Sequence, residues 1–243
     1  MQNRIRKHLN LLPAALVILT AAVFSAAQQS PESKHNARPE ASTVGSRPNE
    51  TEKNSARYSY EFTQPEFYVR HIIIEHDING RGRISFERLN EGPALEEPLE
   101  LSTAAMARIS KLWEALRFLD SGESYQSDRQ FPHLGTMRLT MEQDSRKRTA
   151  EFNWTHNKNV ALLTDEYRRI ADQAVLVFDI GIARENQPLN GPKLMDQLET
   201  MLKRDGLSDP QQLVPLLKEI TTDEHLPLMA RNHAARLLKK IEK

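Results

Sequence analysis

The side chains of this sequence best suited to acid–base chemistry or metal binding are histidines, aspartates and a tyrosine near the expected ends of strands. The candidate binding residues are His76, Asp77, Tyr125, Asp128, His133 and His156. Imidazole and carboxylate groups bind zinc and transfer protons near neutral pH once a fold brings them together. The candidate metal ligands are the three histidines of this set. No phosphate-binding loop, nucleophile motif or dinucleotide fingerprint accompanies them, so the sequence assigns no catalytic residue and implies no cofactor.

The first two candidates stand at the turn of a predicted β-hairpin that spans residues 67–89. Three consecutive isoleucines before the turn favour a strand, and strict alternation of apolar and polar residues follows it. Asn79-Gly80 supplies the positive φ angles that a tight turn needs, and Gly82 allows a bulge beside it. We therefore expect the rest of the folded chain to pack on this hairpin.

The same turn has a second interpretation as a calcium-binding loop. Asp77, Asn79 and Gly82 fall at the first, third and sixth positions of an EF-hand loop. However, Arg81 and Arg88 occupy positions where that loop needs oxygen ligands, and both flanks are typical of strands rather than helices. A plain hairpin turn is the favoured interpretation.

Downstream, the apolar periodicity predicts a helix, a second hairpin and another helix. Ser102 is a suitable N-cap for a helix that ends near residue 120, and Thr164 is a suitable N-cap for the later helix. Residues 137–154 alternate on either side of a polar turn, which is typical of a hairpin. The order β-β-α-β-β-α predicts an α+β domain over residues 58–185, with a four-stranded antiparallel sheet and helices on one face. Residues 58–63 form an extra edge strand at most, and residues 90–100 are expected to be a loop.

This order of elements predicts where the candidate side chains meet. If the first strand rises to the Asp77 turn, the second descends, the helix returns, and the third strand begins at the turn end. The fourth strand then ends at that same end, so His76, Asp77, His133 and His156 are expected to lie together. Tyr125 and Asp128 belong to the long loop above them. The alternative is that polar residues gather there only because strand ends meet water.

The first residues of the chain have the pattern of an export signal. Three basic residues occur within the first seven, an uncharged apolar run covers residues 9–24, and small residues precede a cleavage point after Ala27. Residues 1–27 are therefore predicted to be a signal peptide, and the chain to be periplasmic or secreted. An uncleaved signal that anchors the chain in the inner membrane is the alternative. Residues 28–57 are polar and rich in Ser, Pro and Asn, which predicts a disordered linker.

The charge balance excludes a nucleic-acid-binding protein of the usual kind. The 243 residues carry 33 basic and 33 acidic side chains, whereas nucleic-acid binding needs a basic excess on one face. The chain has no cysteine, so an exported protein of this size must rely on its apolar core rather than on disulfides.

Residues 186–243 have the periodicity of short amphipathic helices and are predicted to form an all-α appendage. Within it, residues 213–241 resemble a single HEAT-type helical unit, on the residues Pro215, Leu216, Leu217, Asp223, Arg231, Ala234, Leu237 and Ile241. HEAT units normally stack in arrays. The resemblance implies an interaction or capping role rather than an activity.

Residues 58–243 also resemble a group of exported bacterial proteins of acidobacterial type that have no assigned function. The segments that carry the resemblance are EFTQPEFYVRHIIIEHD (61–77), FPHLGT (131–136) and EFNWTHNK (151–158). It implies the β-β-α-β-β-α fold and no catalytic residues.

From these observations the chain is expected to be a non-enzymatic binding or interaction module of the bacterial envelope. Its partner would be another envelope protein, a glycan or a second copy of itself. The alternative function is a metal-dependent or acid–base hydrolase that uses the His76, Asp77, His133 and His156 end of the sheet. A protease-inhibitor-like protein is a third option, but no residue of the sequence supports it.

Overall fold

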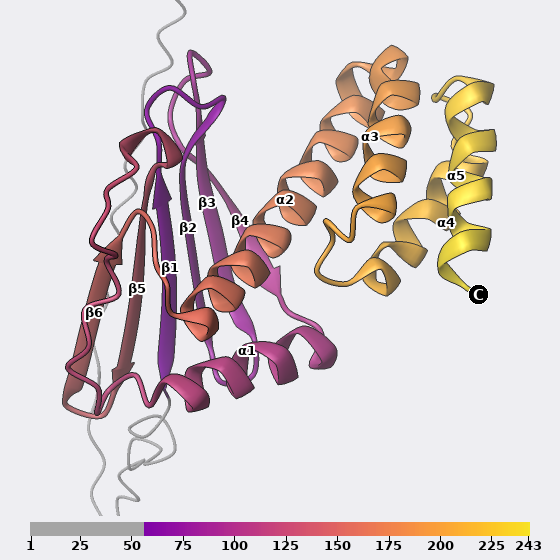
Figure 1. Ribbon diagram of the computed structural model, residues 1–243. Helices are drawn as coiled ribbons and strands as arrows, with labels where there is room; N and C mark the ends of the chain where they lie inside the picture. Colours follow the sequence, from indigo (N-terminus) through magenta and orange to yellow (C-terminus); the bar gives the residue numbers. More distant parts are fainter. Residues whose placement is uncertain (1–55) are drawn as a thin grey trace, which may run out of the picture. The chain divides into compact units, whose positions relative to one another are not determined.

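The computed structural model describes residues 56–243, and this part of the chain is an α+β structure with a six-stranded antiparallel sheet (Figure 1). The predicted signal peptide and all but the last two residues of the predicted linker lie outside the described residues. The predicted fold class is confirmed. The predicted number of strands is wrong, because two further strands join the two expected hairpins.

The sheet has the strand order β4-β3-β2-β1-β5-β6. Its strands are β1 (Arg57–Thr63), β2 (Val69–Asp77), β3 (Arg81–Arg88), β4 (Leu95–Glu100), β5 (Thr136–Gln143) and β6 (Arg146–Phe152). Both predicted hairpins, β2–β3 and β5–β6, are confirmed by their antiparallel registers. β1 joins the hairpins at the centre of the sheet, because its buried aromatic residues Tyr60 and Phe62 belong to the core.

β4 occupies a segment that the sequence predicts as a loop. It pairs only with β3 and contains Pro98, which an edge strand tolerates because the outer N–H of such a strand needs no partner in the sheet. In the β2–β3 turn, Gly80 has a positive φ, as expected. The predicted bulge at Gly82 is absent, since Gly82 stays in register with His76. A Cβ at Gly82 would lie 1.8 Å from the carbonyl oxygen of Glu75, so the close approach of the strands requires glycine there.

The helices are α1 (Thr103–Leu116), α2 (Lys158–Asn186), α3 (Gly191–Lys203), α4 (Val214–Thr222) and α5 (Leu228–Ile241), with 3-10 turns at Pro132–Leu134, Pro188–Asn190 and Pro210–Leu213. Ser102 caps α1 as predicted, accepting a hydrogen bond from the N–H of Ala105. The predicted start of α2 is wrong, because Asn157 caps it and Thr164 lies inside the helix, where its hydroxyl donates to Val160. None of the helices in residues 56–243 is sufficiently long and apolar to cross a membrane.

Two apolar cores meet along α2. The first lies between one face of the sheet, α1 and the beginning of α2, and includes Tyr60, Ile74 and Ile109. The second lies between the end of α2 and the helices α3 to α5, and includes Leu176 and Leu217. The 29-residue helix α2 therefore belongs both to the predicted α+β domain and to the predicted helical appendage.

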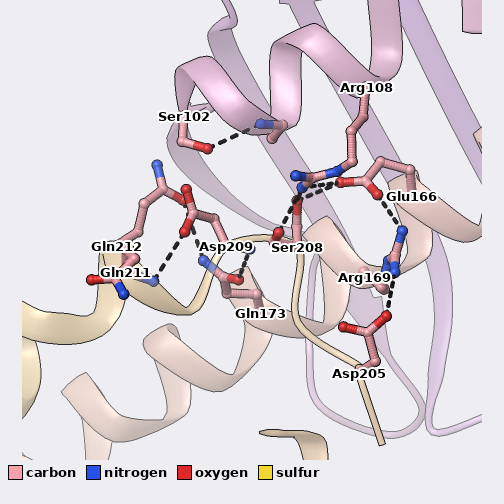
Figure 2. A network of polar contacts seen from close by, with 11 residues as sticks. Ser102, Arg108, Glu166, Arg169, Gln173, Asp205, Ser208, Asp209, Gln211 and Gln212 are labelled. Atoms are coloured by element: carbon pink, nitrogen blue, oxygen red, sulfur yellow. Dashed lines mark hydrogen bonds and ion pairs between the residues drawn. The ribbon is translucent and has the colours of Figure 1, made fainter. Parts of the chain in front are cut away.

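A buried carboxylate ties α2 to its neighbours (Figure 2). The side chain of Glu166 on α2 is 1% exposed. It accepts hydrogen bonds from Arg108 of α1 at 2.8 Å and from the hydroxyl of Ser208 at 2.7 Å, and it pairs with Arg169. Burial alone would raise the pKa of Glu166, but the hydrogen bonds and the two positive charges together hold that pKa below its ordinary value.

We predict that Glu166→Ala destabilises the chain by roughly 2–3 kcal/mol, because it leaves two guanidinium groups without their shared partner. Both arginines retain some contact with solvent, which keeps the loss at the lower end for a buried ion pair. Urea unfolding followed by circular dichroism measures the effect. Asp165→Ala, at the exposed neighbouring position, is the control and should change stability by less than about 1 kcal/mol. Equal losses in the two variants would contradict the role given to Glu166.

Candidate functional site

The structure divides the predicted histidine cluster between the two ends of the sheet. His76 pairs with Tyr58 at the start of β1, whereas Thr136 at the start of β5 pairs with Thr63 at the end of β1. β6 ends beside Met137. His133 and His156, which flank β5 and β6, therefore lie at the end opposite His76 and Asp77. The predicted convergence of these four residues is wrong.

The error has a topological cause. The unforeseen strand β4 adds one reversal of the chain, so that α1 begins at the same end of the sheet as the β2–β3 turn. The long segment 117–135 then runs to the far end, where β5 starts (Figure 1). β5 and β6 consequently run in directions opposite to those expected.

His76 is a buried structural residue. Its Nδ1 lies 2.8 Å from the carbonyl oxygen of Asp77, and its Nε2 lies 2.8 Å from the hydroxyl of Tyr167. Because a carbonyl only accepts, Nδ1 carries the proton and the Tyr167 hydroxyl donates to Nε2. The indole N–H of Trp113 donates in turn to the oxygen of Tyr167 at 3.1 Å. This chain of hydrogen bonds holds the imidazole neutral and accounts for each of its polar atoms.

The remaining predicted residues serve local structure or lie in solvent. The Asp77 carboxylate accepts from the backbone N–H groups of Asn79 and Arg81, which shapes the hairpin turn and leaves the calcium interpretation without support. Tyr125 is buried against Phe118. His133 is exposed, and the exposed side chains of His156 and Asp128 lie 3.5 Å apart. Within residues 56–243 no three such side chains are placed to hold a metal ion, so the zinc hypothesis loses its geometric basis.

Two hollows among the described residues lie along α2. One part holds about 1030 Å³ between α2, α3 and the sheet, and includes Tyr68, Ile72 and Val175 in its lining. A second part holds about 460 Å³ beside the ends of β1 and β6, with Phe67 and Trp154 in its lining.

The two hollows adjoin one another. Phe62 of the smaller part and Ile72 of the larger are cross-strand partners in the sheet. Arg168 and Asp172, one from each part, lie one turn apart on α2. We call the two parts together the α2 groove.

The polar side chains of the α2 groove are mostly paired. Arg88 of β3 is 8% exposed and its guanidinium pairs with Asp179 of α2 at 2.6 Å, over the rings of Phe86 and Phe178. Glu91 accepts a hydrogen bond from the hydroxyl of Tyr68 at 2.5 Å. These contacts fix the walls of the groove around an apolar floor, which is the usual character of a binding site.

Asp172 differs from these residues. Its side chain reaches solvent, yet the surrounding walls raise the pKa of its carboxyl through desolvation, against a smaller opposing effect of the Arg168 charge. A perturbed carboxyl in a concave site is typical of functional positions. The sequence signal for this site was the stripe Asp165, Arg168, Asp172, Val175 and Asp179 at helical spacing, which mixes charged and apolar residues. None of these five residues was among the predicted binding residues.

Comparison with known proteins gives no independent assignment. No protein-family model matches the chain, and no curated protein matches it. The function must therefore be argued from the geometry of the groove.

The neutral state of His76 predicts a pH dependence of stability. Desolvation lowers the pKa of this buried imidazole, and protonation at Nε2 would also leave the Tyr167 hydroxyl without its acceptor. As the pH falls below about 6.5, the unfolded chain takes up a proton that the folded chain resists, so stability decreases until the folded pKa is reached. Urea unfolding at pH values from about 7.5 to about 5 measures the free energy of unfolding. The dependence of this free energy on pH should be weaker for His76→Gln than for the wild type. The exposed control His133→Gln should keep the wild-type slope, and a wild-type slope in His76→Gln would refute this account.

Proposed function

We propose that the chain is a binding module that holds an extended segment of a partner protein in the α2 groove. The observation that carries this proposal is the pair of adjoining hollows along one stripe of α2, with an apolar floor and polar walls. No reaction is assigned to the groove, since no nucleophile with an adjacent base was found among its lining residues.

The length of the groove favours an elongated occupant. Its α2 wall extends from Ala161 to Ala183, which is roughly 35 Å at 1.5 Å per residue. An extended peptide of roughly ten residues covers that distance at 3.3 Å per residue. The larger hollow alone is at the upper limit of ordinary small-ligand pockets.

The chemistry of the walls favours a peptide over a purely apolar chain. The α3 side carries amide and hydroxyl side chains, namely Gln187, Asn190, Gln197 and Thr200. Asn190 donates to Gln187 and Thr200 to the carbonyl oxygen of Asp196, but each of the four side chains keeps a further donor or acceptor, as the backbone of an extended peptide requires. An acyl chain would cover them without offering any hydrogen bond, which is unfavourable.

Other features of the chain agree with an interaction role. The expected export signal would make the partner another envelope or secreted protein, and the expected resemblance of residues 213–241 to a HEAT-type unit points to interaction rather than catalysis. The antiparallel pair α4–α5 packs on α3 and buries Leu217, Ala234 and Leu237, so this unit would serve as a rigid support for the α3 wall.

The proposal is tested by selecting a displayed library of random twelve-residue peptides on the full chain. Peptides with apolar residues should be enriched, and Val175→Arg should weaken their binding about tenfold or more, because the new side chain fills the apolar hollow with a charge. Fluorescence anisotropy of the labelled peptides measures the affinities. Val177→Arg is the matched control, because Val177 lies on the same helix but lines a different hollow.

Two results would contradict the proposal. One is a failure to enrich any peptide, and the other is equal binding by the two valine variants. Self-association of the chain that Val175→Arg abolishes, with no peptide enriched, would show that a second copy occupies the groove instead.

A further inference from the structure

We infer that the bound segment presents a lysine or arginine side chain to Asp172. This inference rests on the proposed function, and it names the chemistry by which the α2 groove would distinguish one peptide from another.

Four carboxylates line the α2 groove, and three of them are already engaged. Asp165 lies 3.5 Å from Arg168, Asp179 lies 2.6 Å from Arg88, and Glu91 accepts from Tyr68. Asp172 makes no ion pair or hydrogen bond through its side chain within residues 56–243. It is therefore the carboxylate of the groove that remains available to a ligand.

The surroundings of Asp172 make a partner cation favourable. Ile72 and Val175 share its part of the groove, and the walls already desolvate the carboxyl enough to raise its pKa. Arg168, one turn earlier on α2, is directed to Asp165 and to the sulfur of Met137. A ligand lying along the groove would remove further water from Asp172, and a carboxylate buried without a partner is strongly unfavourable.

The distribution of charge sets the orientation of that cation. The α3 side of the groove carries the basic residues Lys193 and Arg204, whereas Asp172 stands on the α2 side. A basic side chain of the peptide is repelled by the α3 side and attracted by Asp172. An occupant that is entirely apolar would satisfy neither side, so the groove selects a peptide that combines apolar residues with a basic one.

The test compares the peptides selected on three forms of the full chain: wild type, Asp172→Asn and Glu185→Gln, a matched change at an exposed carboxylate of α2 outside the lining of the groove. Asp172→Asn removes the charge and keeps the shape of a side chain that makes no hydrogen bond or ion pair within residues 56–243. Lysine and arginine should be enriched among peptides selected on the wild type and on Glu185→Gln, and not among those selected on Asp172→Asn. In the strongest wild-type peptide, replacing its basic residue by norleucine should weaken binding roughly tenfold, and this loss should vanish on Asp172→Asn.

The possible failures are distinguishable. If apolar peptides bind, and Val175→Arg abolishes their binding, but the norleucine peptide binds the wild type equally well, this inference is overturned while the proposed function stands. A basic preference that persists in Asp172→Asn likewise overturns the assignment to Asp172. If the library yields no binder on any form of the chain, both proposals are wrong.

Discussion

The buried carboxylate of Glu166 is the interaction on which the arrangement of this molecule depends. A charge removed from water needs several donors, and here they come from α1, from α2 itself and from Ser208 in the segment between α3 and α4. Each of these elements is consequently fixed in position relative to α2. The backbone of this segment is held further, since the N–H of Asp209 donates to the side chain of Gln173 at 2.9 Å. Without these contacts, α2 would still be held by the hydrogen bonds of Tyr167 and by ion pairs such as Arg88–Asp179 and Arg184–Asp223, but it would lose the shared link to α1 and to the segment between α3 and α4.

Buried polar groups in the core between the sheet, α1 and α2 also fix the positions of the elements that carry them. His76, Tyr167 and Trp113 form one chain of hydrogen bonds inside a layer of aromatic rings, in which Tyr60 stacks on Tyr167 and Tyr58 on His76. Each donor in this chain has an acceptor, so the cluster specifies how β1, β2, α1 and α2 meet. A histidine at the end of a strand is suited to chemistry by its type alone, but here its two nitrogens are fully committed to the fold. His76, a candidate for chemistry by its residue type, is thus structural.

The sequence was sufficient for features that depend on neighbouring residues. Both hairpins and the cap at Ser102 follow from alternation, turn residues and a single side chain, and all were predicted. Features that depend on distant pairing were not predicted. β4 has too few apolar residues to be recognised without β3 beside it, and β1 is central only because both hairpins pair with it. One missed strand reversed two others and so separated residues expected to meet. The α2 groove was missed for a related reason: the mixed stripe on α2 indicates a partly polar face, but it does not show which neighbouring elements leave that face uncovered.

The geometry of α2 explains how a single helix carries both the buried Glu166 contacts and one wall of the α2 groove. Residues six positions apart on a helix differ by about 120° around its axis, so Glu166 and Asp172 face different sides. The side of Glu166 is filled by α1 and by Ser208 with its neighbours, where every charge has a partner close by. On the side of Asp172 no further helix of the described chain fills the space above the sheet, and the walls of the groove are held by Arg88 and Asp179. The firm attachment of the first side allows the second to stay open without collapse, and an open, preorganised surface is what a binding module needs.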